Sequence, residues 1–555
     1  MPSSDAIPPP SSSPPSPSWA LRLRTCAHVI WDHLSKHTGV GIVCAVAYFD
    51  PGNWGVDLQA GSDFGYKLLF VVLLSGLFAV FLQVRSLASK LGIVTGLDLA
   101  SHCRLLLYSR TNHPRTVRWL TLYPLYVFSE IAIVSTDLAE LLGSAIALNL
   151  LFPRLPLWAG VLITASDVFL ILAIGDPLQG RPVKMFELFI GALVIAVLIC
   201  MCIIISKVGV DWGDAFYGFV PSKAIFEHGG LYTSVGILGA TVMPHSLFLG
   251  SALSTQDRAS IEPLKPLSHT LHSSETVSTM ATPQRFTLKS LFKSFFGYTT
   301  TETRAEPRNH TERENSSFAF VKAHLNHGIA DIVISLLGLA VVINSLILIL
   351  AGAAFHDGDG SGTSNLFEAH ALINRTIGSG AGVTFALALL CSGQSASIVA
   401  TVAGQIVSEG FLRWRVSPIF RRFLTRLLGL IPSMIVAIAV GKDGVDTMLV
   451  ASQVVLSIVL PFIILPLVWL TSSKTVMRVR LSPPLPLEHG KSNDELPASG
   501  TLKSKDTHEV DAERDAEDRF IDFSNGWIAM VLGYAIWLLV VVANGYVIIT
   551  LILGA

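Results

Sequence analysis

Charged residues are scarce in this chain of 555 residues, at 14% of the total, where soluble domains carry about 25%. The 39 basic and 40 acidic residues leave a net charge of −1, so overall charge does not favour binding to nucleic acid. The 6 cysteines include no C-x-x-C pair and are too few for a disulfide scaffold. No Walker A loop, nucleophile elbow or H-E-x-x-H motif occurs. We therefore expect neither an ATP-driven pump nor an enzyme.

Hydrophobic residues, by contrast, make up 51% of the chain. They form runs long enough to cross a bilayer core of about 30 Å, which needs about 20 residues per helix. The expected spans are 39–62, 66–86, 119–150, 157–175, 185–207, 231–254, 326–355, 380–404, 424–441, 447–471 and 526–553. The sequence therefore predicts an all-α polytopic membrane protein with eleven spans.

Three polar segments lie outside these runs. Residues 1–38 begin with a Pro/Ser-rich stretch that lacks the basic and apolar regions of a signal peptide, so we expect a disordered tail. Residues 255–323 and 473–524 are polar and of mixed charge, which predicts flexible loops. Lys and Arg in the short loops are concentrated on the side that carries the tail and both polar loops. By the positive-inside rule that side is cytosolic, including the N-terminus.

This orientation separates the N-x-S/T sequons. Asn309 and Asn315 fall on the cytosolic side and should carry no glycan. Asn374 faces outward and is a possible N-glycosylation site.

Two of the spans contain helix-breaking residues. In the first, Asp50 is followed by proline and glycine, and a carboxylate at that depth is expected to face a functional cavity. In the sixth, Pro244 has no N–H to donate to the Ala240 carbonyl. Corresponding breaks in two five-helix halves indicate a transporter built from inverted repeats with a binding site near the membrane midplane. The alternative is a pair of ordinary proline kinks.

The residues at the breaks suit a metal cation. Asp50 and Asn53 offer a carboxylate and an amide oxygen, and Ala240 offers a free backbone carbonyl. The thioether of Met243 adds a soft ligand, which favours Mn²⁺ and Fe²⁺ over Mg²⁺ or Ca²⁺. For Met243 taken alone, simple packing is the favoured explanation, because most methionines in membrane helices only pack.

The segments Asp50-Pro-Gly-Asn53 and Gly239-Ala-Thr-Val-Met-Pro-His245 resemble motifs of the Nramp (natural resistance-associated macrophage protein) family of divalent metal transporters. The resemblance covers all eleven spans and leaves out the tail and the two polar loops. It implies a LeuT-like fold with inverted repeats at 39–207 and 231–471 and an eleventh helix at 526–555. The expanded loops are reminiscent of fungal members.

The resemblance also implies an activity and a ligand set. The activity is proton-coupled symport of Mn²⁺ and Fe²⁺, which are substrates, so no cofactor is expected. The implied metal ligands are Asp50, Asn53, the Ala240 carbonyl and Met243, with Gln453 joining them in the occluded state. The family is usually monomeric.

Five further residues form the expected proton pathway: Glu130, Asp137, Glu140, His245 and Arg426. The three carboxylates are spaced so that they lie roughly on one face of the third span. The resemblance implies a relay from Asp50 to Glu140 and Asp137, modulated by Arg426. Structural salt bridging with Arg426 and a neutral, hydrogen-bonding His245 are the alternatives.

The sequence departs from the family pattern at Ser246 and Gly250, where asparagine and a second histidine are often found, and at Leu427, where some members have arginine. These changes leave the metal ligands intact and bear on proton coupling. Two rival functions remain open: an uncoupled or Mg²⁺-type carrier, and a metal-sensing receptor that binds without transport. The expected location is the plasma membrane or an endosomal or vacuolar membrane.

Overall fold

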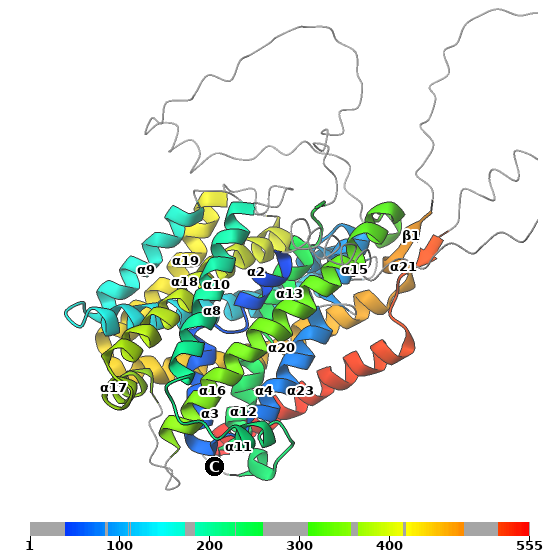
Figure 1. Ribbon diagram of the computed structural model, residues 1–555. Coiled ribbons are helices and arrows are strands. Elements are labelled where there is room, and N and C mark those ends of the chain that lie inside the picture. The colour runs from blue at the N-terminus through cyan, green and yellow to red at the C-terminus, as the bar shows by residue number, and fades with distance from the viewer. Residues whose placement is uncertain are drawn as a thin grey trace, which may run out of the picture.

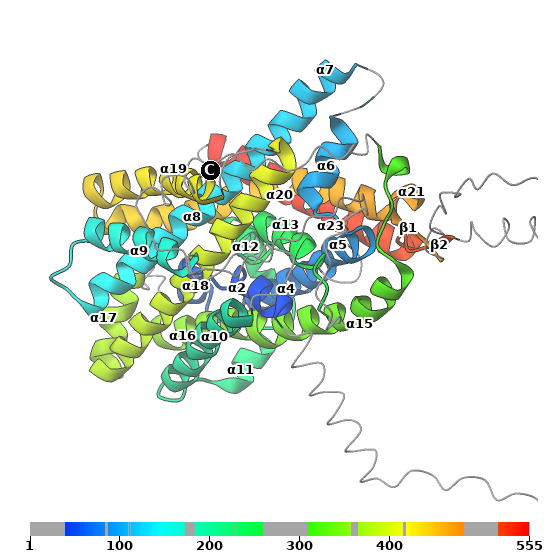
Figure 2. The same cartoon turned by 90° about the horizontal axis from the view of Figure 1, so that it is seen from above.

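The helices of the computed structural model form one bundle, with the two broken spans at its centre (Figures 1 and 2). The structure describes residues 39–83, 87–108, 110, 113–172, 184–227, 229–258, 309–356, 365–413, 418–481 and 520–553. The tail at 1–38, the parts of the polar loops at 259–308 and 482–519, and the short gaps between these ranges lie outside the described residues.

Most of the described residues lie in helices, several of them long and apolar. Up to residue 217 they are α2 (Val40–Val46), α3 (Pro51–Phe64), α4 (Leu69–Gln83), α5 (Ala88–Thr95), α6 (Leu99–Leu107), α7 (Pro114–Val117), η1 (Arg118–Leu122), α8 (Tyr123–Leu151), α9 (Leu157–Leu172), α10 (Lys184–Ile205) and α11 (Trp212–Tyr217). They continue with η2 (Lys223–Phe226), α12 (Gly230–Thr241), α13 (Pro244–Leu253), η3 (His310–Glu312), α15 (Phe318–Ser335), η4 (Leu336–Val341), α16 (Val342–Phe355), α17 (Leu366–Thr376), α18 (Ser379–Leu412), α19 (Pro418–Ala439), α20 (Lys442–Ser472), α21 (Lys474–Met477), β1 (Arg478–Arg480), β2 (Phe520–Asp522) and α23 (Trp527–Leu553).

The expected fold class is confirmed. Within the described residues, eight helices are long and apolar enough to cross a membrane, and two further apolar helices, Leu157–Ser166 and Phe423–Ala439, are shorter. Together with the first span, which is divided into α2 and α3, they account for the eleven spans expected from the sequence.

Packing places the broken helices between long continuous ones. α8 lies against α18, α20, α9 and α19, while α3 lies against α16 and α12 lies against α20. α2 and α13 point toward the end of the molecule that carries β1, whereas α3 and α12 point toward the end that carries α11 (Figure 1). α23 lies along the edge of the bundle and packs mainly on α20.

The ends of both polar loops are structured where flexible loops were expected. β1 pairs with β2 as an antiparallel two-stranded sheet, with Arg478 opposite Asp522. Residues 309–317, called the strap below, lie along the same end of the bundle and lead into α15, which begins at Phe318, eight residues before the expected span. Ser317 caps α15 by accepting a hydrogen bond from the N–H of Phe320. Their polar composition favoured flexible loops, so the sequence did not predict that these segments are ordered.

The strap is held by hydrogen bonds to two parts of the chain. The N–H of Ser316 donates to the Val94 carbonyl at 3.0 Å, and Arg313 donates to the Thr95 carbonyl at 2.9 Å. The side-chain amide of Asn315 donates to the Val476 carbonyl at 2.7 Å. A glycan on that nitrogen would remove one of its hydrogens, which agrees with the expectation that this sequon is bare.

Two histidines join the strap to α6. Thr95 Oγ1 donates to the Leu91 carbonyl at 2.6 Å and so accepts from Nε2 of His102 at 2.8 Å. His102 Nδ1 is then the acceptor for Nε2–H of His310, at 3.0 Å. Burial, reinforced by the nearby Arg313, lowers the pKa of His310 to about 4, and burial lowers the pKa of His102 well below its usual value. Both rings are therefore neutral in the docked strap.

Candidate metal site

The first helix break arranges the carboxylate of Asp50. The backbone of Asp50 is extended, and its side chain caps α3, with Oδ1 accepting the N–H of Asn53 at 2.9 Å. Pro51 occupies the first helical position, where its missing N–H has no consequence. Oδ2 has no hydrogen-bond partner among the described residues, although Asp50 is fully buried. One oxygen is thus held by the helix end and the other is available to a ligand.

Asn53 is arranged in the same way. Its Nδ2 donates to the Tyr48 carbonyl at 2.8 Å, which fixes the direction of the amide. Its Oδ1 is buried and has no partner within the described part of the chain. The break therefore presents one carboxylate oxygen and one amide oxygen, both desolvated and unbonded.

Gln453 of α20 reaches the same break. A Cβ atom at Gly52 would overlap the Gln453 amide, so glycine at that position permits the close approach. Gln453 Nε2 donates to Ser452 Oγ at 3.2 Å, and Oε1 has no partner among the described residues. The expected ligands Asp50, Asn53 and Gln453 are thus brought together.

The second break contributes a backbone carbonyl and a thioether. α12 ends at Thr241 and α13 begins at Pro244, with Met243 extended between them. Pro244 has no N–H, so the Ala240 carbonyl lacks its usual helical donor. Ala240 is 1% exposed and Met243 is fully buried.

Contacts of α12 and α13 place this second break beside the first. A Cβ at Gly239 would overlap the backbone of Gln453. The hydroxyl of Tyr48 lies 2.8 Å from Ser246 Oγ, which donates to the Met243 carbonyl at 2.7 Å. The two breaks are therefore tied to each other and to α20.

Buried polar atoms without partners are rare in folded proteins and call for an explanation such as a missing ion. Here three such oxygens come from Asp50, Asn53 and Gln453. Together with a thioether and a free carbonyl they form a ligand set suited to Mn²⁺ or Fe²⁺.

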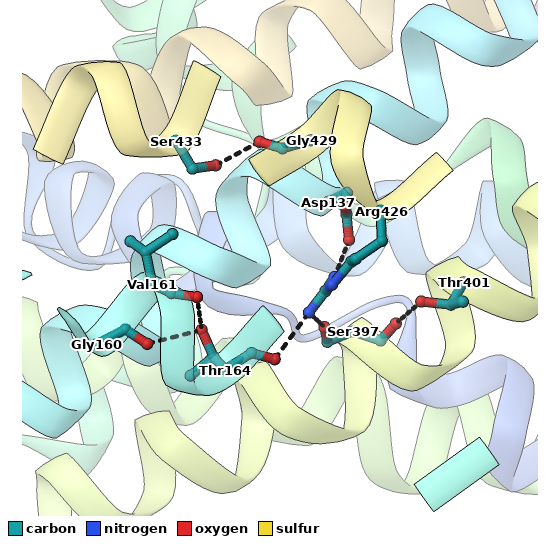
Figure 3. Close-up of polar contacts among 9 residues, drawn as sticks. All are labelled: Asp137, Gly160, Val161, Thr164, Ser397, Thr401, Arg426, Gly429 and Ser433. Atoms are coloured by element: carbon teal, nitrogen blue, oxygen red, sulfur yellow. Dashed lines mark hydrogen bonds and ion pairs between the residues drawn. The ribbon is translucent and has the colours of Figure 1, made fainter. Parts of the chain in front are cut away.

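The expected proton-pathway residues fall into a central group and one outlier. Arg426 of α19 forms an ion pair with Asp137 of α8 and donates to the Thr164 carbonyl at 3.0 Å and to Ser397 Oγ at 2.5 Å (Figure 3). Arg426 is 2% exposed, so its charge is balanced inside the bundle by Asp137.

Glu140 lies on α8 between Asp137 and the part of this helix that contacts the first break. It is 1% exposed, and neither of its carboxylate oxygens has a partner among the described residues. It interacts electrostatically with Asp137, Asp50 and Arg426. A Cβ at Gly143, one turn further along α8, would overlap Pro51, which shows how closely α8 passes the break.

His245 is the second residue of α13 and faces α8. Thr136 Oγ1 donates to the Ala132 carbonyl at 3.0 Å, so it accepts from His245 Nδ1 at 3.3 Å. His245 Nε2, which then carries the lone pair, has no partner within the described part of the chain.

Glu130 is the outlier. It borders a surface cavity of about 260 Å³ lined by residues of α8 alone, including Tyr126 and Ser135. No contact found among the described residues joins it to Asp137 or Arg426. The spacing on α8 puts these carboxylates on one face, as expected, but two turns apart.

Three residues at the site were missed in the sequence. Asn344 of α16 donates to the Tyr48 carbonyl at 2.6 Å, and its Oδ1 is buried without a partner among the described residues. Gln83 of α4 donates to the Ser246 carbonyl at 3.1 Å. The only signal available for Asn344 and Gln83 was an amide inside an apolar run, and Tyr48 gave no signal.

Gln83 also explains a departure from the family pattern. A Cβ at Gly250 would overlap the Gln83 amide, so this amide lies where a larger side chain at position 250 would extend.

The expected glycosylation residue Asn374 lies exposed on α17.

The chain is similar to known metal transporters over nearly its full length. The model of the family described as Nramp, natural resistance-associated macrophage protein-like, matches residues 41–485. The manganese transporter pdt1 of Schizosaccharomyces pombe is 39% identical, over 96% of this chain and 88% of that protein. The iron transporter SMF3 of Saccharomyces cerevisiae is 37% identical, over 95% of this chain and 98% of that protein.

A solved structure is similar as well. It is the manganese transporter of Eremococcus coleocola, which is 28% identical, with a TM-score of 0.63 over 93% of this chain and 87% of that chain.

Proposed function

The chain belongs to the Nramp family of metal transporters, and we propose that it is a proton-coupled symporter of Mn²⁺ and Fe²⁺ that works by alternating access. It is an integral membrane protein and not an enzyme. The finer assignment of metal, proton coupling and mechanism is supported by the chemistry of the buried site.

The observation that carries the proposal is the set of unbonded oxygens at the first break. Asp50, Asn53 and Gln453 each have one buried oxygen without a hydrogen-bond partner among the described residues. Such an oxygen is costly unless a cation takes the place of a donor. The thioether of Met243 adds softness that a site for Mg²⁺ or Ca²⁺ does not need. We infer that all four, with the Ala240 carbonyl, bind the transported metal.

Proton coupling is supported by Glu140. This carboxyl has no hydrogen-bond partner among the described residues and interacts electrostatically with Asp50. A divalent cation at Asp50 repels a proton on Glu140 or His245 by Coulomb's law. Asp137, paired with Arg426, is the next carboxylate along α8 and is proposed to receive that proton. Glu130, two turns further along, is proposed as the last member of the route.

We propose that the metal ion moves from the outer surface toward the cytosol, in the orientation given by the positive-inside rule. The N-terminus and the strap lie on the cytosolic side, so α3 and α12 lead from the outer surface to the site. The membrane concerned is the plasma membrane or an endosomal or vacuolar membrane.

The test is Mn²⁺ uptake into proteoliposomes that contain a pH-sensitive dye, comparing the native protein with Asp50→Asn. Asparagine is as good a helix cap as aspartate, so α3 should persist while the cation loses its charged ligand. We expect Mn²⁺ uptake with internal acidification in the native protein and neither in Asp50→Asn.

Other outcomes identify the rival functions. Mn²⁺ uptake without acidification would indicate an uncoupled carrier. Mn²⁺ binding without any uptake would indicate a metal-sensing receptor. Full activity of Asp50→Asn would show that the site is elsewhere.

A further inference from the structure

One buried carboxylate has no role in the site described so far. Asp57 lies on α3, seven residues after Asp50 and four after Asn53, and is 2% exposed. Its Oδ2 has no hydrogen-bond partner among the described residues, and it interacts electrostatically with Asp50, which carries the same sign. A buried, uncompensated acid inside a membrane helix is costly and marks a functional position.

The helical period of α3 places Asp57 on the same side as the metal ligands. Positions 50, 53 and 57 are three and four residues apart, so they follow one stripe of the helix. At 1.5 Å per residue, Asp57 lies about 10 Å from Asp50 along the axis. α3 runs from Asp50 toward the end of the molecule that carries α11 (Figure 1). Asp57 therefore follows the metal ligands toward that surface.

Two helices flank the face of α3 that carries Asp50, Asn53 and Asp57. On one side is α16, where Asn344 shares the Tyr48 carbonyl with Asn53. Further along, a Cβ at Gly61 would meet Ala351 of α16, so α16 accompanies α3 past the level of Asp57. On the other side is α12, where a Cβ at Gly236 would meet the side chain of Val56.

We propose that Asp57 is a second cation-binding carboxylate of the transport path, which holds a divalent metal ion before the ion reaches Asp50. The proposal rests on the proposed function. The fully buried ligands at Asp50 must capture a strongly hydrated ion, and a carboxylate on the way to them raises the local concentration of that cation. A metal ion held at Asp57 would also compensate its charge, for which no cationic partner is found among the described residues.

The alternative role for Asp57 is structural, with the carboxyl protonated and neutral. Asparagine has the shape and hydrogen-bonding capacity of that neutral acid but lacks the charge that a cation station requires. Asp57→Asn therefore separates the two roles. Asp63→Asn is the matched control, because Asp63 is on the same helix but exposed.

The first measurement is initial Mn²⁺ uptake into proteoliposomes as a function of external Mn²⁺. Loss of a carboxylate about 10 Å from the final site should raise KM about tenfold. The maximal rate should stay within about twofold, because the ligands at Asp50 are intact and weak capture is overcome at high Mn²⁺. Asp63→Asn should keep the native KM. A native KM in Asp57→Asn, or a changed acidification per Mn²⁺ at native KM, would overturn the proposal.

The second measurement is Mn²⁺ binding to the purified protein in detergent, followed by the electron paramagnetic resonance of free Mn²⁺. Native protein should bind one Mn²⁺ tightly and a second weakly. Asp57→Asn should lose the weak site and keep the tight one, while Asp50→Asn should do the reverse. Two sites in Asp57→Asn would overturn the proposal. This experiment measures binding without transport, so its result stands even if the proposed transport function fails.

Discussion

The two oxygens of the Asp50 carboxylate have separate partners: Oδ1 caps α3 through the N–H of Asn53, and Oδ2 has no bond within the described residues. The cap fixes the side chain without protein donors on the second oxygen, so the ligand is preorganised for a cation. Asn53 and Gln453 show the same division between one fixed and one free polar atom.

The thioether of Met243 is the one soft ligand in the proposed metal site, so it should influence the choice of metal. Replacement by leucine keeps the volume and removes the sulfur. We expect Met243→Leu to reduce the preference for Mn²⁺ over Ca²⁺ by about tenfold, mainly through weaker Mn²⁺ binding. Competition of Ca²⁺ with Mn²⁺ uptake in proteoliposomes measures this preference. Met201→Leu, at a fully buried methionine of α10, should leave it unchanged, and an unchanged preference in Met243→Leu would assign Met243 to packing.

The histidine pair makes docking of the strap depend on pH. His102 and His310 have pKa values below their usual 6.5 when docked, with His310 at about 4. The undocked rings take up protons as pH falls below about 6.5 while the docked rings do not, so docking is strongest above that pH and weakens toward pH 4. The N–H of Ser316 bonds to the Val94 carbonyl, so its protection from hydrogen exchange reports docking of the strap. We expect this protection, measured relative to the intrinsic exchange rate at each pH, to fall between pH 6.5 and 5.

The control for this prediction is His310→Gln, whose amide can donate to His102 but does not titrate. The variant should show a smaller pH response of the same N–H. An identical response in both proteins would mean that other groups control the strap.

At the scale of single residues, the sequence identified groups that interrupt a pattern. Asp50, Pro244 and Glu140 stand out because a charge or a proline in an apolar span is conspicuous. Tyr48 and Asn344 could not be found in this way, because their role depends on which helices meet in space. Glu130 was conspicuous as well, yet the structure sets it apart from Asp137.

The broken helices are the elements on which the site depends, and the second break is set by one proline. Pro244→Ala supplies an N–H that can bond to the Ala240 carbonyl and extend α12 into α13. We expect Mn²⁺ affinity to fall about tenfold, because the carbonyl is then partly withdrawn from the metal. Isothermal titration of the purified variant with Mn²⁺ tests this.

Pro432 provides the matched control, since it lies inside α19 and away from both breaks. Pro432→Ala should bind Mn²⁺ with native affinity. Native affinity in Pro244→Ala would exclude the Ala240 carbonyl as a ligand.

At the scale of elements, hydropathy located the long apolar helices of the described residues, and proline located both breaks. It did not locate the strap, β1 or β2, because these short polar segments gain their order from contacts distant in sequence. Asn315, for example, is fixed by the Val476 carbonyl, 161 residues away.

Across the whole molecule, the end that carries α2 is closed by polar contacts between distant helices. The N–H of Gly41 in α2 donates to Asp331 of α15 at 2.7 Å. Arg258, just after α13, pairs with Glu187 of α10 at 2.5 Å, and both are largely buried. These contacts connect the two broken spans to α15 and α10 and favour a state closed at this end.

Loss of the Arg258–Glu187 ion pair should therefore favour opening at the α2 end. Cys44 of α2 is fully buried in the closed structure, so its reaction with a small thiol reagent reports opening. We expect Glu187→Gln to increase the labelling rate of Cys44 about tenfold, because an uncompensated buried Arg258 destabilises the closed state. Peptide mass spectrometry distinguishes Cys44 from the other cysteines.

Glu314→Gln is the comparison variant for this experiment. Its carboxylate lies 4.0 Å from Arg480 in an exposed pair, and exposed pairs contribute little. Labelling of Cys44 should be native in Glu314→Gln. Equal labelling in both variants would mean that the Glu187 pair does not hold this end closed.

The carbonyl of Tyr48 links the proposed metal site to the segment that follows α2. It accepts hydrogen bonds from the amides of both Asn53 and Asn344. A cation on Asn53 Oδ1 draws electron density from that amide and makes its NH₂ a stronger donor, as charge assistance does in general. The loaded ion thereby tightens the connection between the end of α2 and the start of α3 without touching α2. An empty and a loaded site would then differ in how firmly the segment between α2 and α3 is held.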